Sequence, residues 1–346
     1  RSGRPNTLHQ NVRERRMQAI LPLAGKGTRL RPHTHTRPKP LLRVGNRTVL
    51  DRVLDLLEQA GVDEIIGIMG HLSGQIESHL KAEHPNLGFI PVEQTRQLGT
   101  ADAIRLAQPH VRGPVLIVFV DTLFQADLHI IQGRPEVDGI IWAKEVEDYQ
   151  RFGVIVHDDD GYMREIIEKP EHPVSKLANI GLYYIRNVDL LFEGIAHVME
   201  QPPKLGEYFL TDAFQYMIDH EAKLLTSEVS EWWDCGKPET LLDTNLKVLN
   251  AEAASAPDPI PGVEFVQPVR IGEGVVLENT VIGPNVSIAD GSVLRGSKVQ
   301  NSIIGAGSLL EDCEIEQSLI GDHVQARGLR GSASLGDHSE IEERPR

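Results

Sequence analysis

The 346-residue sequence predicts an α/β domain built on a mostly parallel sheet, followed by a smaller domain of stacked repeats. Two observations support this division. From residue 17 to residue 250, apolar runs alternate with amphipathic segments, which is typical of a parallel sheet covered by helices. Beyond residue 262, an aliphatic residue followed by glycine recurs repeatedly, which is typical of a solenoid.

Composition indicates where each part begins and ends. Residues 1–16 are basic and polar without an apolar stretch, so we expect a disordered extension and not a secretory signal. The α/β domain is expected over residues 17–250. Residues 251–262 are rich in alanine and proline and predict a linker. The repeat domain is expected over residues 263–346.

The elements of the α/β domain follow from its apolar and amphipathic runs. The expected strands are Gln18–Leu23, Glu64–Met69, Phe89–Val92, Val115–Val120 and Gly139–Ala143, with shorter ones at Gly153–His157, Tyr162–Glu168 and Ala178–Ile185. The expected helices are Val49–Ala60, Gly74–Lys81, Thr100–Gln108, Val188–Met199, Tyr208–His220 and Pro238–Leu249. Because such sheets bind ligands at the carboxyl ends of their strands, we expect the functional site there.

The second domain repeats an aliphatic residue, a glycine and, after two further residues, a small or branched residue. Such rungs bury their aliphatic side chains against the next rung. The repeats begin at Ile271, Ile282, Ile304, Ile320 and Leu335. Two of them contain a histidine, His323 and His338. Because few repeats are present, we expect structural histidines and a domain that serves assembly or regulation.

Charge and composition exclude several classes of protein. A formal net charge of −15 argues against a nucleic-acid partner, which would require a basic surface. No apolar run approaches the roughly 20 residues that a membrane helix needs. The two cysteines, Cys235 and Cys313, lie in unrelated contexts and predict neither a disulfide framework nor a zinc site. We therefore expect a cytoplasmic enzyme with no membrane partner, and a homo-oligomer.

A glycine-rich turn directly follows the first expected strand. It comprises Leu23, Ala24, Gly25, Lys26, Gly27, Thr28, Arg29 and Leu30. Glycine leaves backbone N–H groups open to phosphate oxygens because it has no Cβ. The spacing matches neither a P-loop nor the dinucleotide-binding fingerprint. The turn therefore predicts a phosphate-binding loop of another type.

This turn and the segment after it resemble the signature of the sugar-1-phosphate nucleotidylyltransferases, GxGTRLxPxT followed by PKPL, at Gly25–Thr34 and Pro38–Leu41. The resemblance implies a Rossmann-like nucleotidyltransferase domain. It assigns catalytic roles to Arg29 and Lys39. The nucleotide-binding residues that it implies in this turn are Leu23, Ala24, Gly25, Gly27 and Thr28. The C-terminal repeats resemble the left-handed parallel β-helix of hexapeptide repeats that some of these enzymes carry.

The implied reaction is the attack of a sugar phosphate oxygen on the α-phosphorus of a nucleoside triphosphate, with loss of pyrophosphate. The attacking oxygen is already anionic, so no general base is required. Two polyanions must be brought together, and we expect positive charge and positioning to supply most of the catalysis.

Further positions match the nucleotide side of the family pattern. Gln94, five positions before Gly99, matches the glutamine that reads the base in the pyrimidine-using branch. An amide both donates and accepts, which suits uracil or thymine. Gly99 is expected to let the base approach the backbone. Thr100 is expected to cap the helix that follows.

Two aspartates match the Mg²⁺ positions of the family. Asp121 ends an apolar strand, although Val120 stands where the family usually has glycine. Asp234 lies in Trp232-Trp233-Asp234-Cys235-Gly236, which matches a Trp-x-Asp-x-Gly motif. Carboxylate oxygens are ligands that Mg²⁺ prefers. The resemblance therefore implies one Mg²⁺ held by Asp121 and Asp234.

The sugar side of the pattern lies in the second half of the domain. The resemblance assigns sugar-phosphate binding to Gly153, Glu168, Lys169 and Asn179. The segment 207–212 is expected chiefly to cap and pack the helix after it.

We therefore expect a Mg²⁺-dependent enzyme that joins a hexose-1-phosphate, glucose-1-phosphate first, to dTTP or UTP. A mannose-1-phosphate guanylyltransferase shares nearly every motif, and Gln94 is the main difference. A bifunctional enzyme with acetyltransferase activity is a further alternative. A non-catalytic regulatory subunit is another, although it would not need to keep Arg29, Lys39, Asp121 and Asp234 together.

Overall fold

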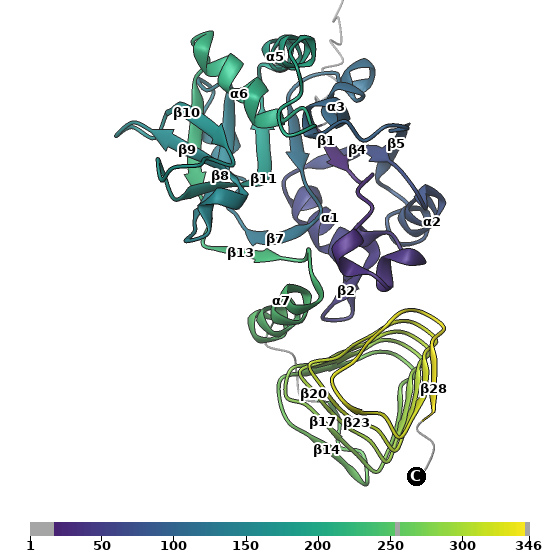
Figure 1. The fold of residues 1–346 in the computed structure, drawn as a ribbon. Helices are drawn as coiled ribbons and strands as arrows, with labels where there is room; N and C mark the ends of the chain where they lie inside the picture. Colours follow the sequence, from purple (N-terminus) through teal and green to yellow (C-terminus); the bar gives the residue numbers. More distant parts are fainter. Residues whose placement is uncertain (1–16, 253–256, 343–346) are drawn as a thin grey trace, which may run out of the picture.

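The computed structural model describes residues 17–252 and 257–342, which form an α/β domain followed by a triangular β-helix (Figure 1). Our expectation for residues 1–16, and those for residues 253–256 and 343–346, lie outside the described residues. The predicted fold class is confirmed in both parts. Three parallel sheets make up the sides of the C-terminal part, as a left-handed β-helix requires.

The α/β domain is built on a nine-stranded sheet with the order β10-β9-β11-β6-β1-β4-β5, in which β8 pairs with β11 and β12. Its strands are β1 (Met17–Pro22), β4 (Val62–Met69), β5 (Gly88–Glu93), β6 (Val115–Val118), β8 (Gly139–Glu145), β9 (Gly153–His157), β10 (Met163–Glu168), β11 (Leu177–Ile185) and β12 (Leu224–Glu228). The half containing β6, β1, β4 and β5 is parallel, whereas β11 runs antiparallel to both β6 and β8.

Two hydrophobic cores cover the two faces of this sheet. On β1, Ala19 and Leu21 belong to one core and Ile20 to the other, because successive side chains of a strand point to opposite faces. All three are fully buried, which explains why a strand with helices on both sides is a continuous apolar run.

Helices α1, α2 and α7 contribute to the first core, and α3, α5 and α6 to the second. The helices are α1 (Val49–Gln59), α2 (Ser73–Glu83), α3 (Thr100–Arg105), α4 (Ile130–Gly133), α5 (Val188–Glu200), α6 (Leu210–Asp219) and α7 (Pro238–Ala251). The short 3-10 helices are η1 (Thr28–Leu30), η2 (His33–His35), η3 (Lys39–Leu41), η4 (Gln108–His110) and η5 (Tyr149–Arg151).

Some expected boundaries were wrong. The strand expected to reach Val120 ends at Val118, and the helix expected over Thr100–Gln108 ends at Arg105. The sequence analysis missed α4, β12 and two small sheets. These sheets pair β2 (Arg43–Val44) with β3 (Arg47–Thr48) and β7 (Thr122–Gln125) with β13 (Glu231–Asp234). Strand β7 depends on a distant partner, β13, which periodicity within one segment does not reveal, and β2 and β3 are too short to show a period.

The β-helix stacks its rungs in three parallel five-stranded sheets. The first contains β14 (Val263–Phe265), β17 (Thr280–Ile282), β20 (Lys298–Gln300), β23 (Glu314–Glu316) and β26 (Arg330–Gly331). The second contains β15 (Val269–Ile271), β18 (Val286–Ile288), β21 (Ile303–Ile304), β24 (Leu319–Ile320) and β27 (Ser334–Leu335). The third contains β16 (Val276–Glu278), β19 (Val293–Arg295), β22 (Leu309–Glu311), β25 (Gln325–Arg327) and β28 (Glu340–Glu342).

The register corrects one of the expected repeats. Ile271, Ile304, Ile320 and Leu335 stack in one column, with Ile288 between the first two. Ile282 lies in the first sheet instead, opposite Phe265 and Val299. His323 and His338 occupy turns with positive φ, and their rings stack at a centroid distance of 5.2 Å.

Helix α7 lies between the two parts of the chain (Figure 1). Its buried Asn245 accepts hydrogen bonds through Oδ1 from the Gly45 N–H of the α/β domain at 2.7 Å and from the Ser287 hydroxyl of the β-helix at 2.9 Å. Ile303 and Leu319 of the β-helix belong to the hydrophobic core that α7 shares with the sheet. The two parts are therefore packed together and not merely tethered.

Among the described residues, 17–252 and 257–342, the structure contains no helix with the length and apolar character needed to cross a membrane.

Candidate active site

A cavity of about 240 Å³ opens where β1 and β6 end, at the carboxyl edge of the parallel strands. Eight of the predicted site residues line it: Leu23, Ala24, Gly25, Lys39, Gln94, Gly99, Thr100 and Asp121. Gly27, Thr28, Arg29 and Asp234 are not among its lining residues. The eight residues that line the cavity come from four separate stretches of the chain.

The glycine-rich turn forms one wall of the cavity. It is tied to the sheet by the hydrogen bond from Leu23 N to Ile68 O at 2.8 Å. Gly27 adopts φ of 59°, and a Cβ there would lie 2.9 Å from Thr34 Cγ2, so the turn requires glycine at this position. The exposed side of Gly25 is open, since a Cβ there would meet nothing within 4 Å. The turn therefore leaves backbone exposed at the entrance of the cavity.

The two predicted catalytic cations differ in their surroundings. Arg29 lies in η1, is exposed, and forms no hydrogen bond or ion pair within residues 17–252 and 257–342. Lys39 begins η3 between Pro38 and Pro40, and its side chain is only 16% exposed. The Lys39 ammonium lies 3.3 Å from the Asp121 carboxylate. One cation is therefore paired in the cavity, and the other is free to meet a ligand.

The pairing of β7 with β13 brings the two predicted metal ligands to the same end of the sheet. Asp121 immediately precedes β7, whose first residue Thr122 lies opposite Asp234. Cys235 donates its backbone N–H to Asp121 O at 3.0 Å. The Asp234 carboxylate accepts the Gly236 N–H at 2.7 Å. In the part of the chain that the structure describes, no group of three or more His, Cys, Asp or Glu side chains could hold a metal ion.

Cys235 directly follows Asp234 and is buried. Burial raises the pKa of its thiol to about 12, with a smaller opposing effect from the charge of Lys39. The thiol is neutral at physiological pH, and nucleophilic cysteines react as thiolates.

The side chain of Gln94 is oriented by a residue that the sequence analysis missed. Its Nε2 donates to Asp102 Oδ2 at 3.0 Å, and both residues are buried. Asp102 is also paired with Arg105 at 2.8 Å. Because an ionised carboxylate only accepts, Asp102 determines which end of the Gln94 amide faces it. The sequence signal was an acidic residue in the first turn of the helix after Gly99.

Gln97 and Glu207 also line the cavity and were not among the predicted site residues. Gln97 donates its side-chain N–H to Ala24 O, which links the glycine-rich turn to the segment carrying Gln94. Glu207 thus belongs both to the segment expected to cap and pack a helix and to the cavity wall.

Gly99 and Thr100 serve the packing of α3 against α6. A Cβ on Gly99 would lie 2.4 Å from Tyr208 O, so the close approach of Tyr208 demands glycine. The expectation that Thr100 caps its own helix was wrong. Gly99 occupies the N-cap, and Thr100 Oγ1 instead accepts the Leu210 N–H at 2.8 Å, where α6 begins.

The predicted sugar-side residues gather in a second cluster. Asn179 donates to Gly153 O at 2.9 Å, and Thr211 donates to Glu168 Oε2 at 3.0 Å. Burial raises the pKa of Glu168 above its ordinary value. A Cβ on Gly153 would lie within 2.4 Å of Asn179 Nδ2, so only glycine fits there.

Lys169 and Tyr183 connect this cluster to its surroundings. The Lys169 ammonium lies 4.0 Å from Glu168 and 4.7 Å from the centre of the Phe209 ring. Tyr183 donates its hydroxyl to Asn179. Its ring packs edge-on against Phe119, a cavity-lining residue, at 6.2 Å between centroids. The cluster therefore adjoins the cavity through one aromatic contact.

Comparisons with known proteins show what the chain is similar to. Residues 18–251 match the family model described as nucleotidyl transferase. A glucose-1-phosphate thymidylyltransferase from Streptomyces antibioticus is 29% identical, covering 94% of this chain and 99% of its own. A nucleotidyltransferase of low-salt glycan biosynthesis from Haloferax volcanii is 31% identical, covering 88% and 92%. The solved structure of a UDP-glucose pyrophosphorylase complexed with UDP-glucose shares the fold, with a TM-score of 0.61 at 22% identity over 68% of this chain and 99% of that one.

Proposed function

Because the chain belongs to the nucleotidyl transferase family, we propose that it joins a hexose-1-phosphate, glucose-1-phosphate first, to dTTP or UTP and releases pyrophosphate. One observation carries the proposal. A single cavity gathers the glycine-rich turn, the Lys39–Asp121 pair and Gln94, which are a phosphate-binding backbone, a paired cation and a hydrogen-bonding amide. The name of the Streptomyces antibioticus relative supports glucose-1-phosphate and a thymidine nucleotide as substrates.

Arg29 and Lys39 would supply the positive charge that the proposed reaction needs. A phosphate oxygen of the sugar-1-phosphate forms a bond to the α-phosphorus while the bond to the pyrophosphate oxygen breaks. Negative charge accumulates on the departing pyrophosphate. Arg29, exposed at the edge of the glycine-rich turn, would bind the β- and γ-phosphates, and Lys39 would stabilise the α-phosphate from inside the cavity. A base is not needed, because the attacking oxygen is already ionised.

Asp121 and Asp234 would hold Mg²⁺ in this proposal. The donor set fits, since Mg²⁺ in such sites is bound by one or two carboxylates together with substrate phosphates and water. Asp121 is half-exposed toward the cavity entrance, and its ion pair with Lys39 keeps it in place. A bound Mg²⁺ would supply charge that neutralises the triphosphate.

Gln94 would read the base. With one N–H donated to Asp102, its amide retains one N–H and the carbonyl oxygen. These complement the carbonyl and N3–H of uracil and thymine. Cytosine presents the opposite pattern, an acceptor at N3 beside an amino donor, and would need the amide reversed. Guanine presents a carbonyl beside N–H as well, so GTP with mannose-1-phosphate is the competing substrate pair to be tested.

We propose that Gly153, Glu168, Lys169 and Asn179 bind the sugar-1-phosphate, with the ammonium of Lys169 on its phosphate. The hydrogen bonds within the cluster and its contact with the cavity wall support this placement. A cytoplasmic location and a homo-oligomeric assembly complete the proposal, and gel filtration with light scattering tests the latter.

The decisive experiment measures pyrophosphate release for dTTP, UTP, GTP, ATP and CTP against glucose-, mannose-, galactose- and N-acetylglucosamine-1-phosphate, each with Mg²⁺ or with EDTA. We expect a maximum at glucose-1-phosphate with dTTP or UTP, lost in EDTA. A maximum at GTP and mannose-1-phosphate would replace the proposed substrates. Folded protein without activity in any combination would refute the enzymatic function.

A further inference from the structure

The β-helix touches the α/β domain at the segment that carries Lys39. Arg37 forms an ion pair with Asp322, and its Nη2 lies 3.6 Å from Asp337 Oδ2. Arg43 donates to Asp322 Oδ1 at 3.0 Å. The two arginines flank Lys39 in the sequence and converge on one carboxylate of the β-helix. Residues 37–43 therefore form an arc whose two ends are held by Asp322. We call this stretch the Lys39 arc.

The carboxylates that hold this arc are themselves fixed by the rungs of the β-helix. Asp322 Oδ1 accepts the Ala306 N–H of the preceding rung at 2.9 Å. Asp337 Oδ1 accepts the Asp322 N–H at 2.8 Å. Each aspartate directly follows an Ile-Gly or Leu-Gly pair, so the repeat pattern places both at the same position of successive rungs. Backbone N–H groups of the β-helix therefore help to hold both carboxylates in place.

Further contacts extend the junction along the same segment. Thr36 donates to Asp337 Oδ2 at 2.9 Å, and His33 Nε2 lies 3.0 Å from the Ser334 hydroxyl. A Cβ on Gly336 would lie 3.2 Å from Pro32 Cβ, which shows how closely the backbones approach.

The Asp322 carboxylate is ionised despite its burial. Its side chain is only 12% exposed, and burial by itself disfavours the charge. Arg43 and Arg37 outweigh this effect and hold the pKa of Asp322 below its ordinary value. Removing the charge would leave the partly buried Arg43 guanidinium without its carboxylate and Arg37 with only the longer contact to Asp337, which is destabilising locally.

We propose that Asp322 is a positioning residue for nucleotidyl transfer, which holds Arg37 and Arg43 and thereby presents Lys39 to Asp121 and the triphosphate. The inference rests on the proposed function of Lys39. It gives the β-helix a part in the reaction itself, because the lysine acts only if its ammonium is placed where charge develops.

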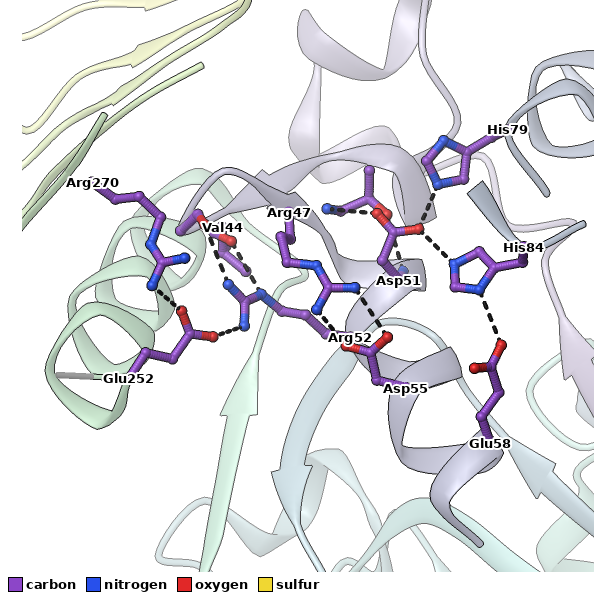
Figure 2. Close-up of polar contacts among 12 residues, drawn as sticks. Val44, Arg47, Asp51, Arg52, Asp55, Glu58, His79, His84, Glu252 and Arg270 are labelled. Carbon is purple, nitrogen blue, oxygen red and sulfur yellow. Dashed lines mark hydrogen bonds and ion pairs between the residues drawn. The ribbon is translucent and has the colours of Figure 1, made fainter. Parts of the chain in front are cut away.

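The first test compares Asp322→Asn with a matched control, Glu252→Gln. Glu252 also joins two arginines across the domain junction, Arg52 and Arg270, neither of which belongs to residues 37–43 (Figure 2). Arg52 also donates to the Val44 carbonyl, one residue beyond that stretch. We expect kcat of Asp322→Asn to fall on the order of 10- to 100-fold, because small displacements of catalytic groups have effects of this size. Substrate KM values should change less than threefold, and Glu252→Gln should keep wild-type kcat. A fall of less than tenfold, or an equal fall in Glu252→Gln, would overturn the proposal.

A double-mutant cycle tests whether the effect passes through the arginine. Arg37→Gln breaks the same ion pair from the α/β side without altering the β-helix. If Asp322 acts by holding Arg37, the double variant should lose little more kcat than the more damaging single variant. If the fold-losses of kcat in the two single variants multiply in the double variant, Asp322 does not act through Arg37. Because the Arg37 variant leaves the rungs intact, the test stands even if Asp322→Asn folds poorly.

A measurement without turnover separates this inference from the proposed function. Hydrogen exchange should be faster in a peptide spanning residues 37–43 of Asp322→Asn than in wild type or Glu252→Gln. Unchanged exchange there would refute the positioning role whether or not the protein is active. If wild type releases no pyrophosphate in any combination while exchange responds as expected, the proposed function fails and the proposed catalytic positioning fails with it.

Discussion

Acid should weaken the folded protein through one histidine at the domain junction. His33 is 2% exposed, and burial lowers the pKa of its imidazole from 6.5 to about 4. Nearby Asp337 opposes this shift and Arg37 adds to it. Between pH 6.5 and 4, His33 therefore binds a proton in the unfolded chain but not in the folded protein. The stabilisation from neutral His33 is complete above pH 6.5 and is lost as the pH falls through this window.

The magnitude follows from the size of the pKa difference. A difference of about 2.5 pH units corresponds to about 3 kcal/mol, and about 2.5 kcal/mol of it should be lost between pH 7 and pH 4.5. His33→Gln keeps a polar side chain beside the Ser334 hydroxyl but does not titrate. Its free energy of unfolding should therefore fall less than that of wild type over the same range.

The assay is urea unfolding at pH 7 and pH 4.5, followed by tryptophan fluorescence. The three tryptophans, Trp142, Trp232 and Trp233, all lie in the α/β domain with His33. Other groups titrate too, since the lowered pKa of Asp322 acts in the same direction and the raised pKa of Glu168 in the opposite one. Asp322 and Glu168 titrate in both wild type and His33→Gln, so their effects cancel when the losses of stability of the two proteins are compared. An equal loss of stability in wild type and variant, within about 0.5 kcal/mol, would refute the reasoning.

Three predictions concern the proposed reaction. Arg29→Ala should lower kcat by roughly 10²–10³, as expected for removing one charge-stabilising donor, and a variant with more than a third of wild-type turnover would count against the assigned role. Glu168→Gln should raise the KM for the sugar-1-phosphate about tenfold, because it replaces a charged acceptor, and an equal rise in the KM for the nucleotide would place Glu168 elsewhere. Asp102→Asn can donate as well as accept, so Gln94 should be able to reverse and the preference for UTP over CTP should fall about tenfold. If the ratio of kcat/KM for UTP to kcat/KM for CTP is unchanged, Asp102 does not fix the orientation of the Gln94 amide.

The cavity-lining residues that the sequence predicted share a local origin. The turn from Leu23 to Gly25 follows a strand that is buried on both faces, so its apolar run and its glycines could be recognised within one segment. Gln94 and Gly99 follow β5, an only partly buried edge strand, and were identified through the family pattern. Asp102 and Gln97 were missed because each acts through a partner, Gln94 or Ala24, that spacing alone does not reveal.

The amino-acid sequence by itself determined the two-part architecture, the strand that leads into the glycine-rich turn and most of the aliphatic column of the β-helix, because hydrophobic periodicity and glycine requirements act over a few neighbouring residues. Only the tertiary structure decided how distant groups meet, including Asp121 and Asp234, whose convergence the family resemblance implied. The pairing of β7 with β13 brings Asp121 and Asp234 to one edge, and the docking of the β-helix places Asp322 between Arg37 and Arg43. These contacts join residues far apart in the sequence, and the ion pairs of Asp322 exist only once the two domains are packed.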